Sequence, residues 1–62
     1  MITKIKEDNR TIRIVTQQYE VGTYVAMYDD KTGEFLDQFG VQCTEEKYHK
    51  EIREKFKDDI VE

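Results

Sequence analysis

The chain has 62 residues with no proline, no tryptophan, three glycines and a single cysteine. One cysteine excludes an internal disulfide, and Cys43 and His49 are the only soft metal ligands, whereas a structural zinc site needs four. We interpret them as a half-buried thiol and a surface imidazole. The sequence lacks any run near the ~20 apolar residues of a membrane span and any apolar run typical of a signal peptide. We therefore expect a cytoplasmic protein that binds neither a metal, a cofactor nor a membrane.

Features of an enzyme are also missing. The chain has no glycine-rich loop to hold a phosphate, and a Cys43–His49 pair would lack a third group to orient it. A chain of this size offers little concave volume for a small-molecule substrate. We therefore predict a non-enzymatic protein.

The length predicts one domain, residues 1–62. A chain this short buries only about 60% of its unfolded surface, so its stability margin is thin. Hydrophobic residues make up 37% of the chain and charged residues 39%, but the apolar residues are clustered, which indicates a folded domain. Oligomerisation or binding to a partner is the remaining way to compensate for a small core.

The formal net charge is −4, and it is unevenly distributed. Residues 1–19 carry a charge of +2, residues 20–46 carry −6, and residues 47–62 are neutral. An acidic domain is repelled by nucleic-acid phosphates and attracted to basic protein surfaces.

The pattern predicts an α+β fold, a three- to four-stranded antiparallel meander with one C-terminal helix packed on one face. The expected strands are 2–6, 11–18, 24–28 and 34–39, with a turn at Asp8 and Asn9. The helix is expected over 45–58, with Thr44 as its N-cap. Its apolar stripe consists of Tyr48, Ile52, Phe56 and Ile60, and we expect the first three to pack with Ile12 and Ile14.

The hairpin over 24–39 has two candidate registers. A four-residue loop, 30–33, places Tyr28 opposite Phe35 and Tyr24 opposite Phe39, which separates an aromatic face from the aliphatic face of Val25, Met27 and Leu36. A slip of one residue would pair Met27 with Asp37 and mix the faces. We prefer the first register, and we expect the aliphatic face to lie under the helix, with the reverse packing as the alternative.

The aromatic face then leads to a functional hypothesis: a protein-binding module with an acidic, aromatic contact surface. One version is a small inhibitor that occupies the basic, nucleic-acid-binding groove of a target, as compact acidic proteins of phages and mobile elements do. One alternative is a homodimer through the spare face or a strand edge, 2–6 or 35–39. The other, less favoured by the charge, is a binder of single-stranded nucleic acid, which would use the cations and tyrosines Lys4, Lys6, Arg10, Arg13, Tyr19, Tyr24 and Tyr28. The predicted partner-binding residues are Tyr24, Tyr28, Asp29, Asp30, Glu34, Phe35, Asp37 and Phe39.

Overall fold

The computed structural model describes residues 1–61 and shows an α+β fold with one antiparallel sheet and one helix. Its elements are β1 (Ile2–Glu7), β2 (Arg10–Tyr19), β3 (Gly22–Asp29), β4 (Phe35–Val41), α1 (Glu45–Lys55) and β5 (Ile60–Val61). The sheet order is β4-β3-β2-β1-β5, so β1 to β4 form a meander and α1 leads the chain across to the far edge. The predicted class is confirmed, but the sheet has five strands rather than three or four.

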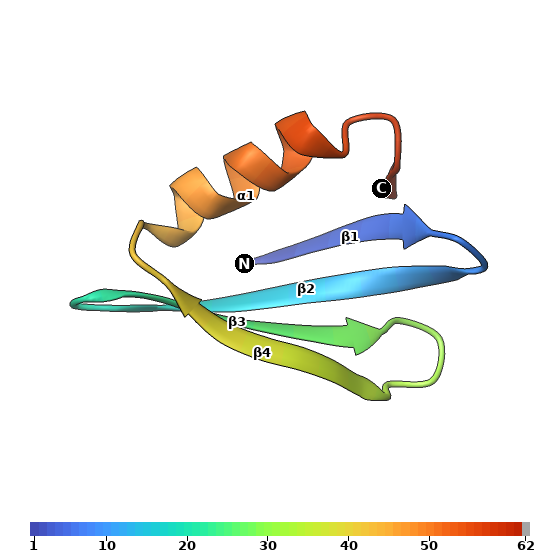
Figure 1. Cartoon of the computed structure of the whole chain (residues 1–62), viewed down its shortest axis with the longest axis horizontal. Helices are drawn as coiled ribbons and strands as arrows, with labels where there is room; N and C mark the ends of the chain where they lie inside the picture. Colours follow the sequence, from blue (N-terminus) through green and yellow to red (C-terminus); the bar gives the residue numbers. More distant parts are fainter. Residues whose placement is uncertain (62) are drawn as a thin grey trace.

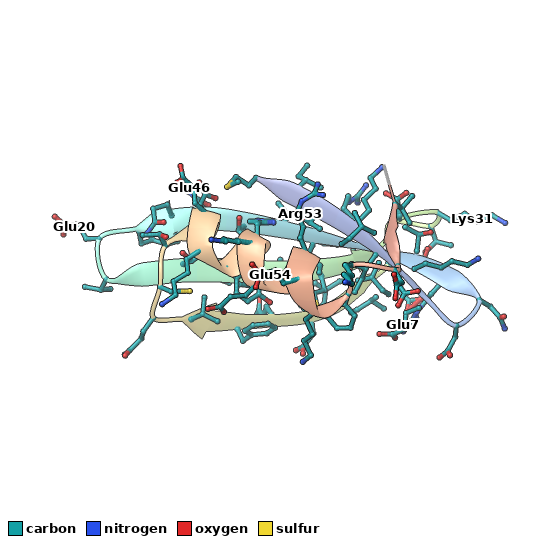
Figure 2. All side chains as sticks on the ribbon, turned by 90° about the horizontal axis from the view of Figure 1, so that it is seen from above. Glu7, Glu20, Lys31, Glu46, Arg53 and Glu54 are labelled. Carbon is teal, nitrogen blue, oxygen red and sulfur yellow. The ribbon has the colours of Figure 1, made fainter. Side chains whose placement is uncertain are left out.

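The molecule has two layers, because α1 covers one side of the sheet and leaves the other side open (Figure 1). Seen from the side of α1, the helix runs along the strands and carries charged side chains such as Glu46, Arg53 and Glu54 (Figure 2). We call the covered side of the sheet the helix side and the uncovered side the open face.

The core lies on the helix side. Its buried members are Ile5, Ile12, Ile14, Val25 and Ile52. Met27, Leu36, Tyr48 and Phe56 pack against this cluster, which confirms that the aliphatic face of the hairpin lies under the helix. Burying apolar area contributes about 25 cal/mol per Å², so this cluster is the main apolar contribution to the stability of the fold.

Short turns connect the first three strands. Asp8 adopts φ 52°, a left-handed conformation that aspartate tolerates, and with Asn9 it forms the predicted turn between β1 and β2.

The loop between β3 and β4 is held by the side chain of Asp29. Its carboxylate accepts hydrogen bonds from the backbone N–H groups of Lys31 (2.9 Å) and Thr32 (3.0 Å). These bonds to the charged form lower the pKa of Asp29, with the bond from Thr32 the largest cause.

The hairpin combines both candidate registers. Next to the loop, Tyr28 pairs with Phe35 as preferred, but Leu36 is an extra residue, and beyond it Met27 pairs with Asp37 and Val25 with Phe39. Such a β-bulge shifts every later side chain to the other face. The predicted pairing of Tyr24 with Phe39 is therefore wrong, because Tyr24 pairs with Gly40.

Helix α1 begins as predicted and ends earlier. The side chain of Thr44 caps it by accepting a hydrogen bond from the N–H of Lys47 at 3.2 Å. The helix ends at Lys55 instead of continuing to residue 58. The negative charges of Asp58 and Asp59 would oppose the helix dipole there. The chain turns instead, and Ile60 in β5 pairs with Ile5 of β1.

Candidate functional site

The open face can be read row by row across the strands. The first row contains Lys4, Arg13, Tyr28 and Phe35, which are consecutive cross-strand partners. The next row contains Ile2, Val15, Ala26 and Gln38, and the third contains Gln17, Tyr24 and Gly40. Tyr19 and Gly22 form the last pair. No helix or strand of residues 1–61 covers these rows (Figure 1).

Apolar and aromatic groups are exposed along this face. Ile2 is 57% exposed, Tyr19 52%, Phe35 51% and Tyr24 38%. Ala26 is buried although it lies on the open face, because the larger side chains around it shield its small methyl group. Several exposed apolar and aromatic side chains thus gather on one uncovered face, and exposed apolar surface of this kind can mark an interaction site.

The strand charges on the open face are all positive. Alternation places Lys4, Lys6 and Arg13 on this face, whereas the acidic strand residues Glu7, Asp29 and Asp37 occupy helix-side positions. A protein with net charge −4 thus presents a cationic open face. One carboxylate from the hairpin loop reaches this face. Asp30 Oδ1 lies 3.3 Å from Lys4 Nζ and 3.6 Å from Arg13 Nη1.

The ring of Tyr28 contacts both of its neighbours in the first row. The guanidinium carbon of Arg13 lies 5.5 Å from the ring centroid, a cation–π distance. On the β4 side, Phe35 makes an edge contact with a centroid separation of 5.8 Å and an interplanar angle of 69°. Tyr28 is therefore half-buried, and its ring is already in contact with a cation and a second aromatic ring.

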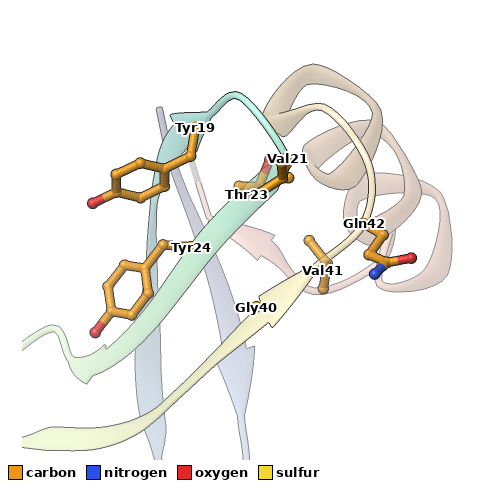
Figure 3. Close-up of a pocket in the computed structure, with 8 residues that line it drawn as sticks. Tyr19, Val21, Thr23, Tyr24, Gly40, Val41 and Gln42 are labelled. Carbon is orange, nitrogen blue, oxygen red and sulfur yellow. The ribbon is translucent and has the colours of Figure 1, made fainter.

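A shallow hollow of about 510 Å³ lies at the opposite end of the open face, where Tyr19 and Tyr24 project to the same side of the sheet (Figure 3). Gly22 and Gly40 also line this hollow, and neither places a side chain in it. Gly22 has φ +149°, and a Cβ there would lie 2.5 Å from the carbonyl oxygen of Val41. A side chain at this position would collide with the backbone, so the close approach of the two strands requires glycine.

A second hollow, of about 290 Å³, lies beside the first row between the β1–β2 turn and the β3–β4 loop. It is lined by the cations Lys6, Arg10 and Lys31 together with Asp29 and Asp30. Positive charge therefore extends from Lys4 and Arg13 around the end of the sheet.

The structure brings together three of the eight predicted partner-binding residues. Tyr24, Tyr28 and Phe35 lie on the open face. Phe39 lies on the helix side instead, where its ring contacts Tyr48 with centroids 6.4 Å apart. Asp37 also has a helix-side position, opposite Met27.

The remaining three predicted residues lie at the end of β3 and in the β3–β4 loop. Asp29 is used in the loop hydrogen bonds, Asp30 lies beside Lys4 and Arg13, and Glu34 is exposed. Sequence reasoning considered the cations of the open face only for the nucleic-acid alternative and did not include them among the partner-binding residues. Their alternation in β1 and β2, with Ile5, Ile12 and Ile14 pointing the other way, is the signal that identifies them.

His49 was predicted as a surface imidazole, and this prediction is wrong because the side chain is only 3% exposed. Its Nδ1 lies 2.6 Å from the hydroxyl of Thr3, and its Nε2 lies 2.7 Å from the hydroxyl of Thr16. Thr16 donates its single proton to Glu45 at 2.8 Å. We therefore assign the imidazole proton to Nε2, which donates to Thr16, while Nδ1 accepts from Thr3.

This network joins β1 and β2 to α1 and is built for a neutral imidazole. Burial is the largest cause that lowers the pKa of His49, and the N-terminal ammonium and Arg53 lower it further, while Glu45 raises it. The hydrogen bond from Thr16 is the largest cause that lowers the pKa of Glu45. The imidazole is enclosed by the packing of α1 on the sheet, so we interpret the network as structural.

Among residues 1–61, no cluster of three or more metal-ligating side chains is present. No helix in the same part of the chain is long and apolar enough to cross a membrane. No known protein family, curated protein or solved structure matches this chain.

Proposed function

We propose that this chain is a non-enzymatic protein-binding module that contacts its partner through the open face. The observation that carries this proposal is the uncovered face itself, on which exposed Tyr19, Tyr24 and Phe35 share one surface with Lys4 and Arg13. Aromatic and arginine side chains are enriched at protein interfaces. A flat surface of this kind suits a macromolecular partner better than a small molecule.

The geometry favours a different charge for the partner than the sequence did. A basic partner would require free carboxylates among the aromatic groups, but Asp29 is bonded to its own loop and Asp30 lies between two cations. Glu34 and Asp37 are exposed but do not lie on the open-face strand rows. We therefore place the contact on the aromatic and cationic groups.

The test is capture from a lysate of the native host with identification by mass spectrometry. We expect the wild-type chain to capture a partner that the variant Tyr24→Ala/Phe35→Ala loses. The matched control is Lys50→Ala/Glu54→Ala, which removes two exposed side chains of α1 and should retain the partner. Circular dichroism confirms that each variant is folded. Capture that is equal for all three proteins would contradict the proposal.

A second candidate function is self-association through β4. This strand is an edge of the sheet, and Phe35 and Phe39 on it are 51% and 36% exposed. Unpaired strand edges can pair with a second chain. The other predicted edge, 2–6, is covered in part, because β5 pairs with Lys4 and Ile5 of β1. Sedimentation at rising concentration tests this candidate, and a strict monomer at high micromolar concentration would exclude it.

A further inference from the structure

The cationic end of the open face already holds a carboxylate of the chain itself. Asp30 Oδ1 lies 3.3 Å from Lys4 Nζ and 3.6 Å from Arg13 Nη1, whereas strong charge-assisted hydrogen bonds measure about 2.7–2.9 Å. All three side chains are partly exposed to solvent. Exposed ion pairs of this kind contribute little and exchange easily. The backbone of Asp30 is held separately, since its N–H donates to Thr11 O at 2.9 Å.

The surrounding charges favour an anionic group at this position. Lys6, Arg10 and Lys31 line the 290 Å³ hollow that Asp30 borders. Lys4 and Arg13 lie beside the carboxylate of Asp30, and the carboxylate of Asp29 is held by its own loop. Among the side chains that line the hollow or contact Asp30, the positive groups outnumber the negative ones, and a second carboxylate would be attracted to them.

We infer that the partner contributes an extended acidic segment whose carboxylate displaces Asp30 from Lys4 and Arg13. Asp30 then acts as an intramolecular competitor that weakens binding to the open face. This inference rests on the proposed function and names the chemistry of the partner. The same charges could attract a nucleic acid, but the net charge of the chain favours a protein segment. A charge of −4 repels a polyanion with one phosphate per nucleotide more strongly than a segment that carries a single carboxylate.

The open face also sets the spacing within such a segment. The hollow beside Tyr24 lies four residues along β3 from Tyr28, which is about 13 Å in an extended strand. A segment lying along β3 would thus place an apolar side chain between Tyr19 and Tyr24 about four residues from its acidic residue. Both anchors lie on the same face of the sheet, so one strand-like segment can reach them together.

The test uses the full chain and a display library of random peptides long enough to span β3. The selected peptides are labelled with a fluorophore, and their dissociation constants are measured by anisotropy at low and high salt. We expect enrichment of aspartate and glutamate, with weaker binding at high salt. Asp30→Asn should tighten binding about threefold, because it removes the competitor. Lys4→Gln/Arg13→Gln should weaken binding about tenfold.

Asp37→Asn is the matched control, because it changes the net charge by the same amount as Asp30→Asn but lies on the helix side. It should leave the dissociation constant unchanged. Selected peptides without acidic enrichment, an Asp30→Asn variant that binds like wild type, or tighter binding of single-stranded oligothymidylate than of any peptide would each overturn the inference.

The Tyr24→Ala/Phe35→Ala variant separates this inference from the proposed function. If the peptides lack acidic residues but this variant still abolishes their binding, the inference fails and the protein-binding open face stands. If the variant binds every selected peptide like wild type, the proposed function fails as well.

Discussion

At the scale of single residues, His49 shows how a polar side chain can hold two layers together. Its imidazole bonds Thr3 of β1 and Thr16 of β2, while the side chain itself comes from α1. A protonated imidazole would have two N–H donors and would reverse the bond from Thr3. Burial of the ring therefore favours the neutral form, in line with its lowered pKa.

We predict that the protein loses stability on mild acidification. The pKa of His49 in the folded state lies below the unfolded value of about 6.5, so the unfolded chain binds more protons as the pH falls. The stabilisation by neutral His49 is complete above about pH 6.5 and is lost as the pH falls towards the folded pKa. Urea unfolding between neutral and mildly acidic pH measures this slope. His49→Gln should be less stable throughout but should show a flatter pH dependence in this window, and an identical slope would contradict the assignment.

A second residue-scale prediction concerns Gly22. Gly22→Ala places a Cβ against the Val41 carbonyl at an unfavourable φ of +149°, and we expect a loss of about 2 kcal/mol or more in the free energy of unfolding. Gly40→Ala is the control, since its Cβ would meet only Thr23 O, at 3.9 Å, and should change stability by less than about 0.5 kcal/mol. Equal effects in urea unfolding would show that the close approach at Gly22 is unimportant.

At the scale of elements, α1 is positioned in two ways. Its buried residues pack on the sheet, and side chains of the sheet bind the backbone where the helix starts. The first N–H of the helix, from Glu45, donates to Gln18 of β2 at 2.7 Å, and the hydroxyl of Thr23 in β3 donates to the Cys43 carbonyl at 2.6 Å. The sheet therefore holds the segment that precedes the helix. This arrangement fixes where α1 begins more firmly than where it ends.

Removing the cap should weaken the helix in a measurable way. Thr44→Ala loses the bond to the Lys47 N–H, and we expect a destabilisation of about 1 kcal/mol. Lys50→Ala, an exposed change in the same helix, should have an effect within about 0.5 kcal/mol. Thermal unfolding followed by circular dichroism compares the two, and a Thr44→Ala variant as stable as wild type would mean that Gln18 alone suffices.

At the scale of the whole molecule, stability and binding are placed on opposite sides of one sheet. Ile52 is the buried apolar residue of the only helix in residues 1–61, so Ile52→Ala should cost about 2–5 kcal/mol. Phe35→Ala on the open face should cost only about 1 kcal/mol, because its ring is half exposed and loses mainly the Tyr28 contact. Urea unfolding of both variants checks this difference. A loss at Phe35 as large as that at Ile52 would indicate that the open face supports the fold itself.

Local patterns were sufficient for much of the fold but for less of the candidate site. Spacing and residue type predict the strand alternation, the Asp8–Asn9 turn and the Thr44 cap. They also predict that the aliphatic face of Val25, Met27 and Leu36 packs under the helix. The bulge at Leu36 does not, because it depends on which side chains the core accepts. Its consequence is that Phe39 joins Tyr48 under the helix and leaves the surface to which it was assigned.

The sequence by itself determined the α+β class, the meander and the helix, because periods of two and about 3.6 residues are properties of the local chain. Only the tertiary structure decided the rest. Ile60 and Val61 became a strand because β1 offered them backbone partners, and His49 became buried because α1 lies over two threonines. The cationic open face likewise required strand pairing, which brings Lys4, Arg13 and Tyr28 into one row although they are far apart in the chain.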